Sequence, residues 1–314
     1  MTDRTDTIET DIVIYDLRAK GLFPVRANLE RLCTGAIWGE GPVWIHEDAS
    51  VLWSDIPNNR MLRWSERDGM TVWRENVEFT NGHARERDGS ILHCSHGQRA
   101  IVRTRFGPHL EDAADEIVVG LFEGKRFNSP NDIIVKRDGT IWFSDPPYGI
   151  VSDREGHAAE SELGDNYVFR YDPATGALTV ATDFVEEPNG LAFSPDESVL
   201  YVSDTSAALR TDGGGHHHIV AFDVVHGREL VDPRIFAVIE PGLADGFRVD
   251  REGCIFTSSA DSVQVFHPDG TRLARIGVPE KVANLTFGGP DGKELYICAS
   301  SSLYRIRLNT RGAT

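Results

Sequence analysis

Short runs of alternating apolar and polar residues, separated by tight turns, follow one another along almost the whole chain. A typical segment is NDIIVKRDGTIWFSDPPYG (131–149), in which Asp-Gly separates two apolar runs. Turn chemistry of this kind between β-rich runs is the strongest short-range signal of a β-hairpin. Helical periodicity is weakly evident only near residues 111–117, which disfavours a parallel α/β sheet. The pattern therefore predicts an all-β protein.

Six segments share this form: a polar residue, an apolar run, a turn, a second apolar run ending in small or acidic residues, and a third strand. The segments begin at Glu40, Asn81, Asn131, Asn189, Asp245 and Asn284. Subtracting successive positions gives separations of 41, 50, 58, 56 and 39 residues, and polar, Gly-rich insertions at 153–166 and 207–218 account for the two longest. Repeats of roughly 40–50 residues with four strands each are typical of propeller blades.

We therefore predict one six-bladed β-propeller domain over residues 26–314, preceded by an N-terminal extension at residues 1–25. Strand residues at about 30–36 are expected to pair with the last blade, because this pairing closes the ring and removes a free sheet edge.

Charge and composition narrow the classes of partner. The net charge of −17 disfavours nucleic acid and anionic membranes, which need a basic face. No apolar run approaches the roughly 20 residues needed to span a bilayer, and the charged N-terminal residues do not resemble a signal peptide. Four widely spaced cysteines without a CxxC pair favour reduced structural thiols. We expect a cytoplasmic protein.

The six blade-starting residues converge on the propeller axis, because the innermost strand of each blade lines the central tunnel. Every one of them carries a side-chain oxygen, whereas His and Cys are absent from these positions. One interpretation is an oxygen-lined site for a hard cation such as Ca²⁺. The other is that Asn and Asp simply form turns there, although Glu40 is a poor turn former.

Two further groups of residues allow two interpretations each. Antiparallel pairing returns the ends of the second strands to the same face of the ring. The residues at these ends, which would either close turns or form a rim that binds substrate hydroxyls, are Asp55, His96, Asp145 and Asp204. The run His216–His218 in the second insertion is either an exposed loop or part of a lid over the tunnel.

Four stretches resemble the senescence marker protein/gluconolactonase family, in particular its bacterial sugar lactonases: WGEGPVW (38–44), NSPNDIIVKRDGTIWFSDPPYG (128–149), EPNGLAFSPDESVLYVSDT (187–205) and ADGFRVDREG (244–253). The match runs from about residue 25 to the C-terminus. Its motifs EGP, PND, PNG and DG are short, but they occur one per blade in the family's order. Blade two departs from the pattern, because NGHARERDGSILHCSHG stands where a simpler turn is expected.

The resemblance implies a propeller with one divalent cation, usually Ca²⁺, in the central tunnel. It implies that Glu40, Asn189 and Asp245 bind the metal, and that Asn131 is either a fourth ligand or a substrate contact. Asp245 also occupies the family's position for a general base or nucleophile. Zn²⁺, Mg²⁺, Mn²⁺ and Fe²⁺ are further candidates for such a site.

The expected reaction is hydrolysis of a sugar lactone to the aldonic acid, with the metal as a Lewis acid and Asp245 as base or nucleophile. The residues expected to contact the small-molecule lactone or shape its pocket are His83, His96, Arg126, Asn128, Asn131, Asp132 and Tyr148. The sequence specifies neither the lactone nor an oligomeric state.

Two alternatives use the same site differently. Squid-type diisopropylfluorophosphatase resembles this family and also holds calcium with a Glu, two Asn and an Asp, so a phosphotriester is a second substrate class. A polar rim built from Asp55, Asp145, Asp204, His83 and His96 would favour the sugar lactone. The other alternative is a non-catalytic scaffold in which the metal is structural.

Overall fold

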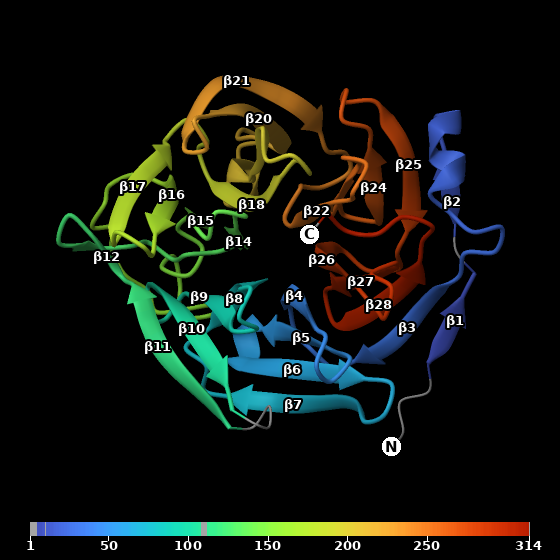
Figure 1. Ribbon diagram of the computed structural model, residues 1–314, viewed down its shortest axis with the longest axis horizontal. Helices are drawn as coiled ribbons and strands as arrows, with labels where there is room; N and C mark the ends of the chain where they lie inside the picture. The colour runs from blue at the N-terminus through green and yellow to red at the C-terminus, as the bar shows by residue number, and fades with distance from the viewer. Residues whose placement is uncertain (1–4, 10, 108–111, 314) are drawn as a thin grey trace.

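The computed structural model describes residues 5–9, 11–107 and 112–313 of the chain. Within these ranges, six antiparallel sheets of four or five strands stand around a central axis (Figure 1). The strands nearest this axis are β4, β8, β14, β18, β22 and β26. The predicted all-β fold, a six-bladed β-propeller, is confirmed.

Each blade runs outward from the axis. Blade one contains β4 (Gly39–Ile45), β5 (Ser50–Asp55), β6 (Arg60–Ser65) and β7 (Gly69–Glu75). Blade two contains β8 (Thr80–Arg85), β9 (Ile91–Ser95), β10 (Ala100–Phe106) and β11 (Ala113–Val119). Blade three contains β14 (Ile133–Val135), β15 (Ile141–Asp145), β16 (Tyr167–Asp172) and β17 (Ala177–Thr182).

The second half of the ring repeats this arrangement. Blade four contains β18 (Pro188–Phe193), β19 (Val199–Asp204), β20 (His218–Val225) and β21 (Glu229–Val238). Blade five contains β22 (Phe247–Val249), β23 (Ile255–Thr257), β24 (Ser262–Phe266) and β25 (Arg272–Gly277). Blade six contains β26 (Val282–Gly288), β27 (Glu294–Ala299), β28 (Ser302–Arg307) and β3 (Leu29–Thr34).

Few elements lie outside the blades. A hairpin of β12 (Leu121–Phe122) and β13 (Lys125–Arg126) lies between blades two and three, and the short 3₁₀ helices are η1 (Leu17–Gly21), η2 (Ile56–Asn58) and η3 (Ser206–Ala208). No helix of the described residues is long and apolar enough to cross a membrane. The weak helical periodicity near residues 111–117 was misleading, because Ala113–Val119 is the outer strand β11 and pairs with β10.

The two ends of the chain meet in blade six. Strand β3 pairs antiparallel with β28, with Cys33 opposite Leu303, so the predicted closure of the ring is confirmed. The segment expected to be an extension supplies two further outer strands. Of these, β1 (Asp6–Ile8) pairs with β3, and β2 (Ile12–Ile14) pairs with β25 of blade five. Residues near the N-terminus therefore cover the outer edges of two neighbouring blades (Figure 1).

The apolar core is divided among the spaces between blades. Between blades six and one, Trp44 and Tyr296 stack with ring centroids 5.4 Å apart, beside the buried Trp53 and Cys298. Between blades three and four, Trp142 packs in a cluster with Leu191 and Val202. Because each apolar face is covered by the next blade, the polar residues at the strand starts are left to line the axis.

A glycine follows the first polar residue in four blades, and the structure gives a steric reason for it. The Gly190 N–H donates to the Asp245 carbonyl of the next blade at 3.0 Å, and the Gly82 N–H donates to the Asn131 carbonyl at 2.8 Å. A Cβ added at Gly190 would lie 2.3 Å from that Asp245 oxygen. The short NG and DG motifs therefore keep neighbouring blades close at the mouth of the tunnel.

Replacing Gly190 with alanine is expected to lower the free energy of unfolding by about 1–3 kcal/mol, because the added methyl group must push apart two backbones. Thermal or urea unfolding measures the loss. Gly21→Ala is the matched control, since a Cβ at Gly21 meets nothing within 4 Å. Equal stability of the two variants would contradict the close-approach explanation.

Candidate functional site

The polar starts of the inner strands open into a cavity of about 450 Å³ at one mouth of the tunnel. Five of the six blade-starting residues line it: Glu40, Asn81, Asn131, Asn189 and Asp245. The sixth, Asn284, lies behind them and donates from Nδ2 to Glu40 Oε2 at 3.0 Å. The volume lies within the range of small-molecule sites. The four residues expected to bind a metal are thus brought together.

The carboxyl groups of the buried Glu40 and the partly buried Asp245 dominate the electrostatics of this cavity. Burial raises the pKa of Glu40 well above its usual value, and the nearby charge of Asp245 raises it further. Burial likewise raises the pKa of Asp245, although Lys281 at the cavity wall and the Asn189 amide act in the opposite direction. Two neighbouring carboxylates of like charge, both partly or fully removed from water, are unfavourable unless a cation or protons compensate them.

Two buried oxygens in the cavity lack a hydrogen-bond partner among the described residues, namely Glu40 Oε1 and Asn81 Oδ1. Their neighbouring atoms are satisfied, because Glu40 Oε2 accepts the Gly41 N–H at 2.9 Å and Asn81 Nδ2 lies 3.3 Å from His96 Nε2. Buried oxygens normally have partners. A ring of carboxylate and amide oxygens with two atoms unsatisfied fits a hard divalent cation, for which oxygen is the preferred ligand.

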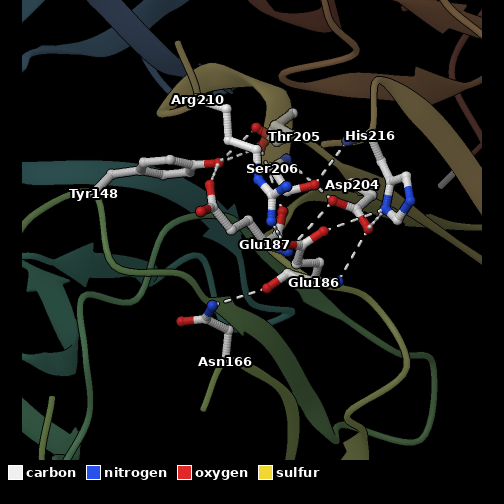
Figure 2. A network of polar contacts seen from close by, with 9 residues as sticks. All are labelled: Tyr148, Asn166, Glu186, Glu187, Asp204, Thr205, Ser206, Arg210 and His216. Carbon is white, nitrogen blue, oxygen red and sulfur yellow. Dashed lines mark hydrogen bonds and ion pairs between the residues drawn. The ribbon is translucent and has the colours of Figure 1, made fainter. Parts of the chain in front are cut away.

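Neighbouring strands and loops hold the remaining cavity residues. Asn189 Nδ2 donates to Thr205 Oγ1 at 3.3 Å, and the Tyr148 hydroxyl lies 2.6 Å from the same oxygen. Figure 2 shows Tyr148 reaching Thr205 and Glu187, with which its hydroxyl forms a 2.7 Å hydrogen bond. Tyr148 lines the cavity, as expected for a wall residue.

Three hydrogen bonds hold the backbone of Asp245 in place. Its N–H donates to Ser258 Oγ at 2.7 Å, and its carbonyl accepts from Ser203 Oγ at 3.1 Å as well as from Gly190. These contacts come from its own blade and from blade four. A carboxylate on such a rigid segment is pre-positioned for chemistry.

The carboxylates at the ends of the second strands do not form a rim around this cavity. Each accepts backbone N–H groups that lie 17 or 18 residues earlier in the chain: Asp55 from Ile37, Asp145 from Asn128, and Asp204 from Glu186 and Glu187. They tie each incoming loop to its blade, so these three residues have a structural role and do not form the expected rim.

Blade two has His96 in place of this aspartate. Its Nδ1 lies 2.8 Å from the Glu155 carbonyl oxygen and its Nε2 contacts Asn81, so it supports the cavity from behind. Burial lowers the pKa of His96 to about 4, and that of His83 to about 4. His83 Nδ1 contacts the Gly41 carbonyl, and its ring lines a different cavity, formed by the far ends of the inner strands.

Three other residues expected to hold substrate hydroxyls also lie outside the lining of the cavity. Arg126 is exposed and donates to the Gln98 carbonyl at 3.2 Å. Asn128 is fully buried, and its Nδ2 donates to the Asp165 carbonyl at 2.9 Å. Asp132 is buried behind Asn131, where Oδ1 accepts the Ile133 N–H at 2.9 Å. Since these groups are engaged elsewhere, a direct contact with substrate is not supported for them, nor for His83 and His96.

The structure adds cavity residues that the sequence reasoning missed. Those with polar or aromatic side chains are Trp38, Ser152, Arg154, Glu155, Thr205 and Lys281. Lys281 Nζ lies 5.1 Å from the centre of the Trp38 ring. Ser152, Arg154 and Glu155 lie at or just before the start of the first Gly-rich insertion. The presence of this insertion in the sequence could therefore have predicted that its residues form a wall of the site.

The raised pKa of Glu40 has a consequence for stability. Without a cation, the folded protein retains protons on this carboxyl group at a pH where the unfolded chain has lost them, so its stability falls as pH rises above about 4. A bound cation stabilises the ionised carboxylate of Glu40 and so removes this loss of stability at higher pH. We expect the increase in Tm on adding Ca²⁺ to be larger at pH 8 than at pH 5, as measured by thermal unfolding. An equal increase at both pH values would contradict this account of the site.

Comparisons with known proteins show which family the chain resembles. The family model described as "SMP-30/Gluconolactonase/LRE-like region" matches residues 38–301. The chain is 31% identical to a gluconolactonase of Zymomonas mobilis subsp. mobilis, over 96% of this chain and 87% of that protein. It is 30% identical to the pentonolactonase XacC of Haloferax volcanii, over 82% of this chain and 80% of that protein.

A solved structure is similar over almost its entire length. It is a gluconolactonase of Xanthomonas campestris, which superposes with a TM-score of 0.88 at 37% sequence identity. The match covers 98% of each chain.

Proposed function

Because the chain belongs to the SMP-30/gluconolactonase/LRE-like family, we propose that it is a lactonase that hydrolyses a sugar lactone to the aldonic acid. The reaction takes place in the cavity around Glu40 and Asp245, with a divalent cation held by Glu40, Asn189 and Asp245. The observation that carries this proposal is the convergence of two carboxyl groups with raised pKa, Glu40 and Asp245, and two unsatisfied oxygens on one small-molecule cavity.

The donor set favours Ca²⁺. All candidate ligand atoms in the ring are carboxylate or amide oxygens, which hard cations prefer, and imidazole and thiolate are absent from the residues that line the cavity. Asn81 and Asn131 are positioned to complete the set or to contact the substrate. When bound, the cation supplies Lewis acidity toward a carbonyl oxygen.

Asp245 is the candidate general base. A cation bound beside Asp245 would keep its carboxylate ionised at neutral pH, as a proton acceptor requires, although it would also lower the basicity of that carboxylate. Asp245 takes a proton from the water that adds to the lactone carbonyl. The ring C–O bond then breaks, and the proton returns to the departing ring oxygen. The alternative is direct attack by the carboxylate, which forms a mixed anhydride as the ring C–O bond breaks; water then hydrolyses the anhydride. Incorporation of ¹⁸O from labelled water into Asp245 in a single turnover, through attack on the Asp245 carbonyl, would establish this route.

The walls of the cavity favour a hydroxylated substrate over an apolar phosphotriester. Polar groups from Ser152, Arg154 and Glu155 face it, together with the amides of Asn81 and Asn131. The rim expected from the second-strand residues is not the source of this polarity, since those carboxylates bind backbone N–H groups. The polarity comes instead from the loop after β15 and from the amides at the starts of the inner strands.

A competition assay on the purified, Ca²⁺-loaded protein tests the substrate class. Glucono-δ-lactone, a pentonolactone, an unsubstituted δ-lactone and diisopropyl fluorophosphate are compared by kcat/KM. We expect both sugar lactones to exceed the unsubstituted ring by at least about tenfold, because missing hydroxyls leave polar groups of the site unpaired. Faster hydrolysis of the phosphotriester, or no hydrolysis of any of these compounds, would overturn the proposal.

A further inference from the structure

A cluster of two imidazoles and one carboxylate lies behind the wall of the cavity, in blade four. It consists of Asp204, His216 and His218, and one ligand atom from each lies within 4.8 Å of the other two. His216 Nδ1 is 3.1 Å from Asp204 Oδ2, and the rings of the two histidines stack with centroids 4.7 Å apart. None of the three residues lines the proposed active site.

The sheet itself brings these side chains together. Asp204 ends β19 and stands directly opposite His218, the first residue of β20, in the antiparallel register. His216 precedes His218 by two residues, and alternate residues of an extended chain point to the same side. The intervening His217 points away, and its Nδ1 contacts the Ile239 carbonyl oxygen at 2.9 Å. The triple-histidine run therefore divides into two candidate ligands and one structural residue.

The carboxylate is already oriented by its surroundings. Asp204 accepts the N–H groups of Glu186 at 3.0 Å and Ser206 at 3.1 Å, and it is buried, whereas His216 is half-exposed. Figure 2 shows His216 and the Glu186 carboxylate on either side of Asp204. Outer hydrogen bonds of this kind fix the ligands of metal sites. The exposed side of His216 gives an ion a route to the cluster.

We infer that Asp204, His216 and His218 form a second metal site, which binds Zn²⁺ in preference to Ca²⁺. Two imidazoles and one carboxylate, completed by water, form a donor set that Zn²⁺ accepts in four-coordinate sites. Imidazole suits Zn²⁺, whereas Ca²⁺ takes six to eight oxygen ligands. The donor set at Glu40, Asn189 and Asp245 contains only oxygen, so the two sites differ in the ion that they select.

The second site lies at the base of a loop that also forms part of the cavity wall. His216 and Asp204 close the base of the insertion at 207–218, because the Ala207 N–H donates to the His216 carbonyl at 3.1 Å and the His216 N–H donates to Ser206 Oγ at 2.8 Å. Ala208 and Leu209 of the same loop line the cavity. A metal at the base of the loop would hold this wall in place.

Calorimetric titration of Zn²⁺ into metal-stripped protein resaturated with Ca²⁺ tests the inference. The wild type is expected to bind one Zn²⁺ that excess Ca²⁺ does not displace. His216→Ala and His218→Ala are each expected to weaken this binding by at least about tenfold. His217→Ala is the matched control, since it removes a histidine from the same run, and it is expected to keep the wild-type affinity.

Failure to bind Zn²⁺, unchanged affinity in the His216→Ala/His218→Ala double variant, or equal loss in His217→Ala would each overturn the inference. His216 is half-exposed, so its substitution leaves the fold intact, and circular dichroism verifies this for every variant. The readout is binding rather than turnover, so the result stands whether or not the protein proves to be a lactonase.

Discussion

Replacing Asp245 with asparagine is expected to lower kcat for sugar-lactone hydrolysis by about 10²- to 10⁴-fold, the usual contribution of a general base. Asparagine has nearly the same shape, and the backbone contacts of residue 245 to Ser258, Ser203 and Gly190 do not involve the side chain. The variant should therefore fold. The rate is measured at saturating Ca²⁺, so that weaker cation binding does not contribute to the loss.

Asp250→Asn is the control for this substitution. Asp250 is a buried aspartate of the same blade, but it accepts the Cys254 N–H at 2.8 Å beyond the other end of β22. We expect its substitution to affect stability and to leave kcat unchanged. Wild-type turnover by a folded, cation-loaded Asp245→Asn variant would show that Asp245 is not the base.

Replacing Glu40 with glutamine is expected to have two effects of opposite sign. The metal-free protein should become more stable at neutral pH, because glutamine removes the free-energy cost of keeping a buried carboxyl group protonated beside Asp245. The affinity for Ca²⁺ should fall by at least about tenfold, because the number of charged ligands sets the affinity of oxygen sites. Thermal unfolding without metal and calorimetric titration with Ca²⁺ measure the two effects.

A purely structural role for Glu40 would give a different result. If Glu40 only anchored the Gly41 N–H and the Asn284 amide, its substitution would destabilise the protein and leave Ca²⁺ binding unchanged. Asn284→Ala is the matched control, since it removes the group that holds Glu40 without changing the charge of the cavity. We expect a smaller loss of affinity in that variant.

The ring of blades could be predicted because its signals are local. Each hairpin has its own Asp-Gly or similar turn, and each inner strand begins with a polar residue followed by an apolar run. Once six such units are placed in a ring, Glu40, Asn189 and Asp245 must face one axis. The pairing of β3 with β28 followed from the need to close the sheet of the last blade.

The surroundings of the cavity could not be predicted in the same way. A carboxylate at a strand end can face the axis or accept an N–H from the incoming loop, and the Ser-Asp pattern is identical in both cases. Asp55, Asp145 and Asp204 bind the loop. Arg154 and Lys281 reach the cavity from loops whose course depends on tertiary contacts. The hydrogen bond from Asn128 to the Asp165 carbonyl depends on tertiary contacts in the same way.

The central claim, cation-dependent lactone hydrolysis at Asp245, is tested most directly by a pH-stat assay of metal-stripped protein on glucono-δ-lactone. Ca²⁺ and the other divalent cations are added back singly, with Asp245→Asn in parallel. The account predicts acid release that requires a cation and is lost in the variant. Equal acid release without any cation, or no release with every cation on correctly folded protein, would contradict it.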